Sequence, residues 1–193
     1  MTKELLSGAA IAITFVAFIP YIRSIRSGAT KPHVFTWVIW GFATFVVFWG
    51  QLVAEAGAGA WPTGISGLIT IYVAVLAFTK RGDISISLTD WAFFLAAMTA
   101  LPLWFLTSDP LWAVVILTLV DILGYGPTIR KVSKDPYSER LGFYLLMGVR
   151  NLVSIAAIER YSLTTLLFPA ATAAAIGLLF AVVVRRRLDV NPP

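Results

Sequence analysis

The sequence predicts an all-α membrane protein in which seven transmembrane helices form two three-helix repeats joined by a linker helix. Two observations lead to this prediction. The first is composition: of 193 residues, 59% are hydrophobic and 13% are charged. An ordinary soluble domain is about 45–50% apolar and about 25% charged. The second is an internal repeat, whose two copies are expected to face each other across a membrane.

The repeat is marked by the motif Pro-x-Ile-Arg, which begins at Pro20 and again at Pro127. Each copy stands near the end of a long apolar run and precedes a short basic segment and a further apolar run. The same offset of 107 residues aligns Trp37 with Tyr144 and Gly41 with Gly148. Because the motif at the end of the first run recurs far inside the chain, we interpret that run as part of the mature fold rather than a signal peptide.

Seven apolar stretches are close to the length of about 20 residues that a membrane-spanning helix needs. They cover residues 5–22, 34–54, 61–79, 88–106, 110–128, 141–158 and 162–184. The fourth is the least regular, because Pro102 interrupts it and Asp90 lies near its start. Pro110 opens the fifth, where a first-turn proline loses no helical hydrogen bond.

The repeat pairs the first three stretches with the last three and leaves the fourth between them. We therefore expect a first triple-helix repeat at 1–82, a linker helix at 83–109 and a second triple-helix repeat at 110–193. With a single linker helix, both repeats begin on the same side of the membrane and are related by an axis along its normal.

Basic residues predict the orientation. Seven spans would place twelve of the 15 Lys and Arg residues on one side: Arg23, Arg26, Lys31, Lys80, Arg81, Arg130, Lys131, Lys134, Arg140, Arg185, Arg186 and Arg187. The other side would hold only Lys3 and Arg160. Since cytoplasmic loops carry the excess of Lys and Arg, we expect the N-terminus outside and the C-terminus inside. The basic loops would then face anionic lipid head groups.

Two ionisable residues, Asp121 and Arg150, fall well inside predicted spans. A charge at the centre of a span costs at least about 2.5 kcal/mol on insertion scales. The helical rise places Asp121 roughly 10 Å and Arg150 roughly 13 Å from the inner ends of antiparallel helices, so we expect them to form an ion pair. The first repeat has Thr14 and Ala43 at the matching positions, which concentrates charge in the second repeat. The pair is either a site for a proton, a cation or a substrate, or a fixed link between two helices.

Several uncharged residues are candidates for contact with a solute. Asn151 matches Thr44 of the first repeat, and an amide in a span either binds substrate or joins helices. Neighbouring helical residues point about 100° apart, so Arg150 and Asn151 are not expected to face one point. Ser66 and Thr70 are polar residues of the third span.

Aromatic residues divide by their position along the spans. Trp40 lies about one turn deeper than Trp37 on the same face, which makes Trp40 the better candidate for stacking on a solute. Trp61, Trp91 and Trp112 lie near predicted span ends, where tryptophan anchors a helix at the membrane interface.

Three residues are candidates for opening and closing a path. Pro20 and Pro127 each remove a helical hydrogen bond and permit a bend, so they either act as hinges or end their helices near the membrane surface. Gln51, near the outer end of the second span, is either part of an outer gate or solvated.

A seven-helix plan of three, one and three spans, with a proline near the inner end of the first helix of each triplet, resembles the PQ-loop and SWEET superfamily. The residues that carry the resemblance run from Pro20 to Pro32 and continue through Trp37 to Gly41. The sequence departs from the family at Tyr21 and Thr128, where the motif glutamine would stand. The third spans also lack the asparagine of the sugar-transporting members. PnuC-type vitamin transporters share the helix plan.

The resemblance and the repeat together predict a transporter of a small polar solute, such as a sugar, an amino acid or a vitamin-like nucleoside, working by alternating access. The alternative is a non-transporting receptor or assembly factor of the same fold, like the KDEL receptor. We expect no enzyme activity, cofactor, catalytic residue or metal site, because the chain has no Cys and one His, His33. The expected partners are the solute and the bilayer of a bacterial plasma membrane, with no nucleic acid. The sequence does not decide between a monomer and a homo-oligomer.

Overall fold

The structure is a computed structural model that describes residues 2–29, 32, 34–80, 86, 88–134, 136 and 141–189. Within these ranges, side chains are described except at 126–128, 130, 131, 134, 141 and 189. The sequence-based expectations for Lys31, His33, Arg81 and Arg140 concern residues outside the described part of the chain.

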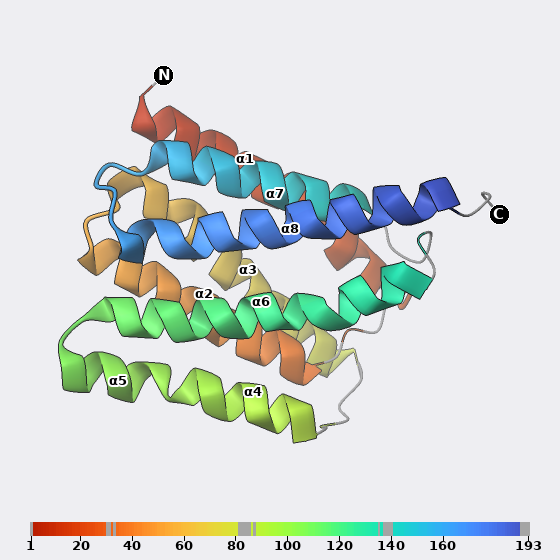
Figure 1. The fold of residues 1–193 in the computed structure, drawn as a ribbon, viewed down its shortest axis with the longest axis horizontal. Coiled ribbons are helices and arrows are strands. Elements are labelled where there is room, and N and C mark those ends of the chain that lie inside the picture. The colour runs from red at the N-terminus through yellow and green to blue at the C-terminus, as the bar shows by residue number, and fades with distance from the viewer. Residues whose placement is uncertain are drawn as a thin grey trace.

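Helices make up the ordered elements of the described residues, and they lie side by side along the long axis of the molecule (Figure 1). They are α1 (Lys3–Arg26), α2 (Val34–Val53), the 3-10 helix η1 (Gly57–Ala60), α3 (Trp61–Thr79), α4 (Leu88–Met98), α5 (Ala100–Thr107), α6 (Pro110–Lys134), α7 (Leu141–Ala157) and α8 (Leu163–Asp189). Five segments are long and apolar enough to cross a membrane: Lys3–Arg26, Val34–Val53, Gly57–Thr79, Leu88–Thr107 and Leu163–Leu188. The predicted all-α, membrane-type fold is confirmed at this level.

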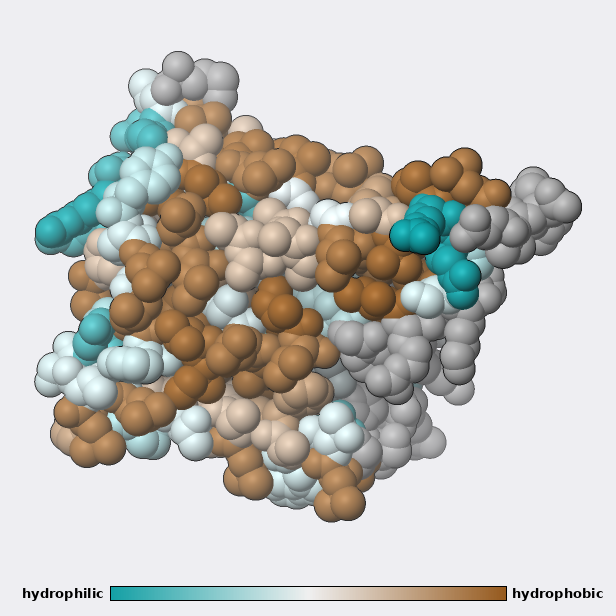
Figure 2. Space-filling model, in the orientation of Figure 1, coloured by the Kyte–Doolittle hydropathy of each residue, from teal (hydrophilic) through white to brown (hydrophobic). Residues whose placement is uncertain are grey.

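The surface is apolar around the middle of the bundle. Near the middle of α3, α6 and α8, Leu68, Leu119 and Leu178 expose 55%, 57% and 57% of their surface. Figure 2 shows a broad hydrophobic band with hydrophilic residues toward the two ends. A soluble monomer rarely exposes so continuous an apolar surface, whereas a bilayer would cover it.

One end of the bundle, called here the basic end, carries positively charged helix termini. Arg23 and Arg26 lie in the last turn of α1, and Arg186 and Arg187 in the last turn of α8. The expectation that these residues lie in loops is wrong, because the helices continue through them. Cations near a helix C-terminus interact favourably with the helix dipole, and their long side chains reach polar surroundings from an apolar stem.

The first two helices of each half of the chain begin at matching positions. An offset of 107 residues relates the first residue of α1, Lys3, to that of α6, Pro110, and the first residue of α2, Val34, to that of α7, Leu141. In the first half α3 packs against both α1 and α2, and in the second half α8 packs against both α6 and α7. Contacts between the halves join α1 to α7 and α2 to α6.

The paired glycines explain part of this packing. A Cβ added to Gly41 would lie 2.9 Å from the Ile71 side chain on α3. One added to Gly148 would lie 3.1 Å from the Ile176 side chain on α8. In each half, a glycine of the middle helix therefore lets the third helix approach closely, as small residues do in membrane bundles.

The segment between the halves is a broken helix. Helices α4 and α5 are separated at Thr99, whose amide donates to the carbonyls of both Leu95 and Ala96. Pro102 follows three residues later, and its ring lacks the N–H that would bond one turn back. The irregularity that Pro102 predicts in the fourth span is thus located at Thr99.

Neither motif proline ends its helix. Pro20 lies inside α1, which continues to Arg26, and α6 runs on past residue 127 to Lys134. The interpretation of these prolines as helix ends is therefore wrong. Pro20 is exposed on the outside of α1, and its missing N–H permits a bend there.

We predict that Gly41→Ala lowers the unfolding temperature, because the added Cβ overlaps the Ile71 side chain. Overpacking of this kind costs about 1–3 kcal/mol. The matched control is Gly8→Ala, which makes the same change where nothing lies within 4 Å. Thermal unfolding of both variants in detergent, followed by tryptophan fluorescence, tests the prediction, and equal unfolding temperatures would contradict it.

Candidate functional site

Polar side chains lie near the midpoint of six long helices, in what we call the central polar layer. Its members are Thr14, Thr44, Ser66, Thr70, Asp121, Arg150, Asn151 and Thr172. All are buried except Asp121, which is partly buried. Polar groups at this depth in a membrane bundle face protein or a cavity rather than lipid, which makes this layer the candidate functional site.

Arg150 on α7 is the most constrained member, with 2% of its surface exposed. Its Nη2 donates a hydrogen bond to the carbonyl oxygen of Pro62 at the start of α3. Its Nη1 donates to Oδ1 of Asn151 at 2.6 Å. The two neighbouring positions point apart on the helix, but the long Arg150 side chain folds back to bond Asn151.

Asp121 on α6 accepts a hydrogen bond at 3.2 Å from the Thr172 hydroxyl on α8. Asp121 and Arg150 interact electrostatically with each other, and Tyr125 on α6 lies in the field of both. No ion pair within 4.0 Å joins the two residues, both of which the structure describes. The predicted direct pair is therefore wrong, because each charge takes a different hydrogen-bond partner.

Five buried polar atoms have no hydrogen-bond partner among the described residues. They are Nε of Arg150, Nδ2 of Asn151, Oγ1 of Thr63, Oγ1 of Thr118 and Oε1 of Gln51. Buried polar groups are nearly always hydrogen-bonded in folded proteins. Unsatisfied donors on two side chains that already bond each other mark a place where a further acceptor would be stabilised.

The uncharged candidates are buried, and the bonds given for them are local. Thr70 donates to the carbonyl of Ser66, one turn back in α3, at 2.8 Å. Thr44 lies against α3 at Gly67. The Thr70 hydroxyl is thus satisfied within its own helix, as Ser and Thr hydroxyls commonly are.

An aromatic cluster lies between the central polar layer and the basic end. Phe18 and Tyr21 of α1 meet Phe143 of α7, with ring centroids 5.4 and 6.1 Å apart. Tyr21 also stacks on Trp37 of α2 at 5.2 Å. Trp37 is only 8% exposed, so it is a packing residue rather than an interface anchor.

Trp40 connects this cluster to the charged part of the site. Its ring lies 5.6 Å from Trp37, and its indole nitrogen would be 3.3 Å from a Cβ on Gly124. Gly124 is three residues after Asp121, on the same face of α6. Trp40, predicted as a stacking residue, is thus placed beside the helix that carries the acidic group.

The opposite end of the bundle is closed by two interlocked loops, which we call the loop seam. One side is the segment 51–62 around η1, and the other is the segment 156–165 between α7 and α8. The Glu159 amide donates to the Ala56 carbonyl at 3.1 Å. The Glu159 carboxylate accepts from the Ala58 amide at 2.9 Å.

Small residues make this close approach possible. A Cβ on Gly59 would lie 2.6–2.7 Å from the Cα and amide nitrogen of Ile158, and one on Gly57 would overlap the Glu159 carboxylate. Gly57 also has a φ of 59°, which favours glycine. The seam was not predicted from the sequence, although the pattern Gly57-Ala58-Gly59 is a signal for close backbone packing.

Longer side chains add to the seam on both faces. Glu55 and Arg160 form an exposed ion pair, and Lys3 of α1 donates to the Ala156 carbonyl at 2.8 Å. On the inner face, Gln51 is 1% exposed and donates to the Thr165 carbonyl at 3.1 Å. Gln51 is therefore not solvated, and it links the two halves at the position where an outer gate was predicted.

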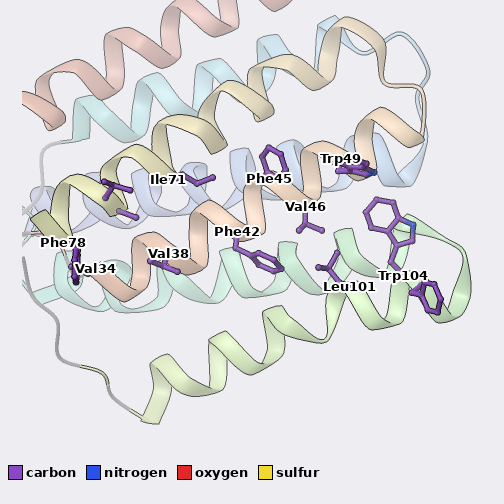
Figure 3. A pocket seen from close by; sticks show the side chains of 13 residues that line it. Val34, Val38, Phe42, Phe45, Val46, Trp49, Ile71, Phe78, Leu101 and Trp104 are labelled. Carbon is purple, nitrogen blue, oxygen red and sulfur yellow. The ribbon is translucent and has the colours of Figure 1, made fainter.

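A groove of about 900 Å³ on the outside of the bundle does not fit a polar solute. It lies between α2, α3 and α5, and Figure 3 shows the apolar side chains that line it, among them Val38, Phe42, Phe45, Trp49, Leu101 and Trp104. Its walls are almost entirely hydrocarbon and aromatic. Such a surface suits lipid chains, so the candidate site for a polar solute remains the central layer.

No protein-family model, no curated protein and no solved structure gives a significant match to the chain. Within the described residues, no three His, Cys, Asp or Glu side chains come together as a metal site would require.

We predict that Gly59→Ala opens the loop seam, because the new Cβ collides with the backbone of Ile158. The chain has no Cys, so a single Thr63→Cys reporter, at a position with 0% exposure, gives a labelling signal without background. We expect maleimide to react faster with the reporter in the Gly59→Ala background than in the Gly8→Ala background. Equal rates at unchanged unfolding temperatures would contradict the role given to Gly59.

Proposed function

We propose that the protein is a membrane transporter that moves a small polar solute by alternating access between two triple-helix bundles. The observation that carries this proposal is the central polar layer, where Asp121 and Arg150 lie at mid-depth without pairing directly. Unpaired intramembrane charges are costly and usually mark a substrate or ion pathway. The layer lies between two closed ends, the aromatic cluster and the loop seam.

The proposed architecture is the 3+1+3 plan, with α1 to α3 and α6 to α8 as the bundles and α4 with α5 as the linker. It is supported by the shared offset between the starts of α1 and α6 and of α2 and α7, and by the packing of the third helix of each half against the other two. The basic end is proposed to face the cytoplasm, since Lys and Arg concentrate there. With this plan the chain resembles the PQ-loop and SWEET superfamily.

The two ends supply the gates of this mechanism. The loop seam would be the outer gate, held by a few hydrogen bonds and one exposed ion pair, which contributes only about 0–1 kcal/mol. The aromatic cluster would be the inner gate. Pro20 directly precedes Tyr21, so a bend at the missing hydrogen bond moves the ring that stacks on Trp37.

The orientation is tested by single-cysteine labelling in intact cells. We predict that Tyr161→Cys, exposed at the loop seam, reacts with a membrane-impermeant maleimide without permeabilisation. Leu188→Cys, exposed at the basic end, should react only after the membrane is opened. The reverse pattern would place the basic end outside and contradict the proposed orientation.

Transport is tested with purified protein in liposomes, by counterflow of labelled sugars, amino acids and vitamin nucleosides. We predict flux of one solute class, and a roughly tenfold or greater loss in Asp121→Asn and in Arg150→Gln, equivalent to at least about 1.4 kcal/mol. Glu4→Gln and Arg23→Gln make the same changes at exposed positions and should retain flux. Absence of flux from folded wild-type protein for every solute would contradict the proposal and favour a receptor of the KDEL-receptor type.

A further inference from the structure

The central polar layer offers two unsatisfied donors at one place. Arg150 uses Nη1 and Nη2 on Asn151 and Pro62, which leaves Nε without a partner among the described residues. Asn151, 1% exposed, likewise has an unpartnered Nδ2. A carboxylate accepts several hydrogen bonds and is the strongest acceptor for a guanidinium. The site at Arg150 and Asn151 is therefore suited to an acidic group of the solute.

The same layer offers a separate acidic site on α6. Asp121 is partly buried and receives one hydrogen bond, from the neutral hydroxyl of Thr172. Trp40 packs beside the same face of α6, next to Gly124. A carboxylate with an aromatic face nearby attracts a cationic nitrogen, through charge and through the ring quadrupole.

The two sites lie in the same proposed bundle, on α6 and α7, two helices that both pack against α8. Asp121 and Arg150 interact electrostatically, yet no ion pair within 4.0 Å joins them. A solute with one acidic and one basic group would satisfy both residues at once and leave the occupied site neutral. A neutral sugar or nucleoside would leave both Asp121 and Arg150 without an opposite charge. A solute with a single charge would leave one of the two residues without an opposite charge. Uncompensated charges are costly in a membrane interior.

We infer that the transported solute is a zwitterion of the amino-acid type, whose carboxylate binds at Arg150 and Asn151 and whose ammonium group binds at Asp121. The inference rests on the proposed transport function and names its substrate class. Asp121 and Arg150 then have separate tasks. Each selects one charged group of the solute.

The experiment measures ligand-induced thermal shifts and dissociation constants on the full-length protein in detergent. The common amino acids are screened first, beside D-glucose and a nucleoside. The best amino acid is then compared with its amide, which lacks the carboxylate, and with its 2-hydroxy acid, which lacks the ammonium group. For the wild-type protein we expect both analogues to bind at least roughly tenfold more weakly than the amino acid.

The variants assign each group of the solute to a residue. In Arg150→Gln the preference for the amino acid over its amide should disappear, while the preference over the 2-hydroxy acid remains. In Asp121→Asn the opposite pattern is expected. Should Arg150→Gln not fold, Asn151→Ala removes the second donor and should reduce the same preference. Glu4→Gln, exposed at the start of α1, is the control that retains both preferences.

Failure of the inference and failure of the proposed function give different results. Binding and flux of glucose or the nucleoside, with no response to any amino acid, would overturn the inference and leave transport in place. Equal binding of the amino acid and both analogues by wild-type protein would also overturn it. Neither binding nor flux with any solute in folded protein would overturn both.

Discussion

The burial of Arg150 is the constraint on which the centre of the molecule depends. A guanidinium at mid-membrane has no bulk water to bond, so its donors must find acceptors within the protein. The carbonyl oxygen of Pro62 is one such acceptor. It can accept from Arg150 in addition to its hydrogen bond within α3, because a carbonyl oxygen has two lone pairs. Removing one partner of a buried charge typically costs about 3–5 kcal/mol. This bond therefore fixes the start of α3 against the middle of α7, and so joins the two halves of the chain.

The loop seam follows from that constraint. With α3 held at Pro62, the preceding 3-10 turn lies against the α7–α8 loop, where only glycine fits at positions 57 and 59. The seam is made of a few hydrogen bonds and one exposed ion pair rather than a large apolar interface. The other end is closed by stacked aromatic rings. The loop seam and the aromatic cluster thus lie on either side of the central polar layer. The proposed alternating access requires this arrangement, with one gate on each side of the binding site.

Sequence patterns predicted the features that depend on composition and length. The apolar runs located the helices to within a few residues at most ends, and Pro102 marked the broken fourth segment. The sequence patterns did not predict which hydrogen-bond partners the long polar side chains reach. Arg150 was expected to meet Asp121, but it folds back to Asn151 and reaches Pro62, while Asp121 bonds Thr172. The helices also extend through the basic residues that were assigned to loops, because hydropathy falls before the helix ends.

The central claim is that solute passes the Asp121 and Arg150 layer only when the loop seam opens. The most direct test replaces the exposed pair Glu55 and Arg160 by cysteines in the Cys-free chain and joins them with a short bifunctional thiol reagent. Cross-linking should abolish solute flux in liposomes, while a cleavable form of the reagent should restore flux after reduction, and each single-cysteine variant should be unaffected. Undiminished flux through fully cross-linked protein would contradict the account.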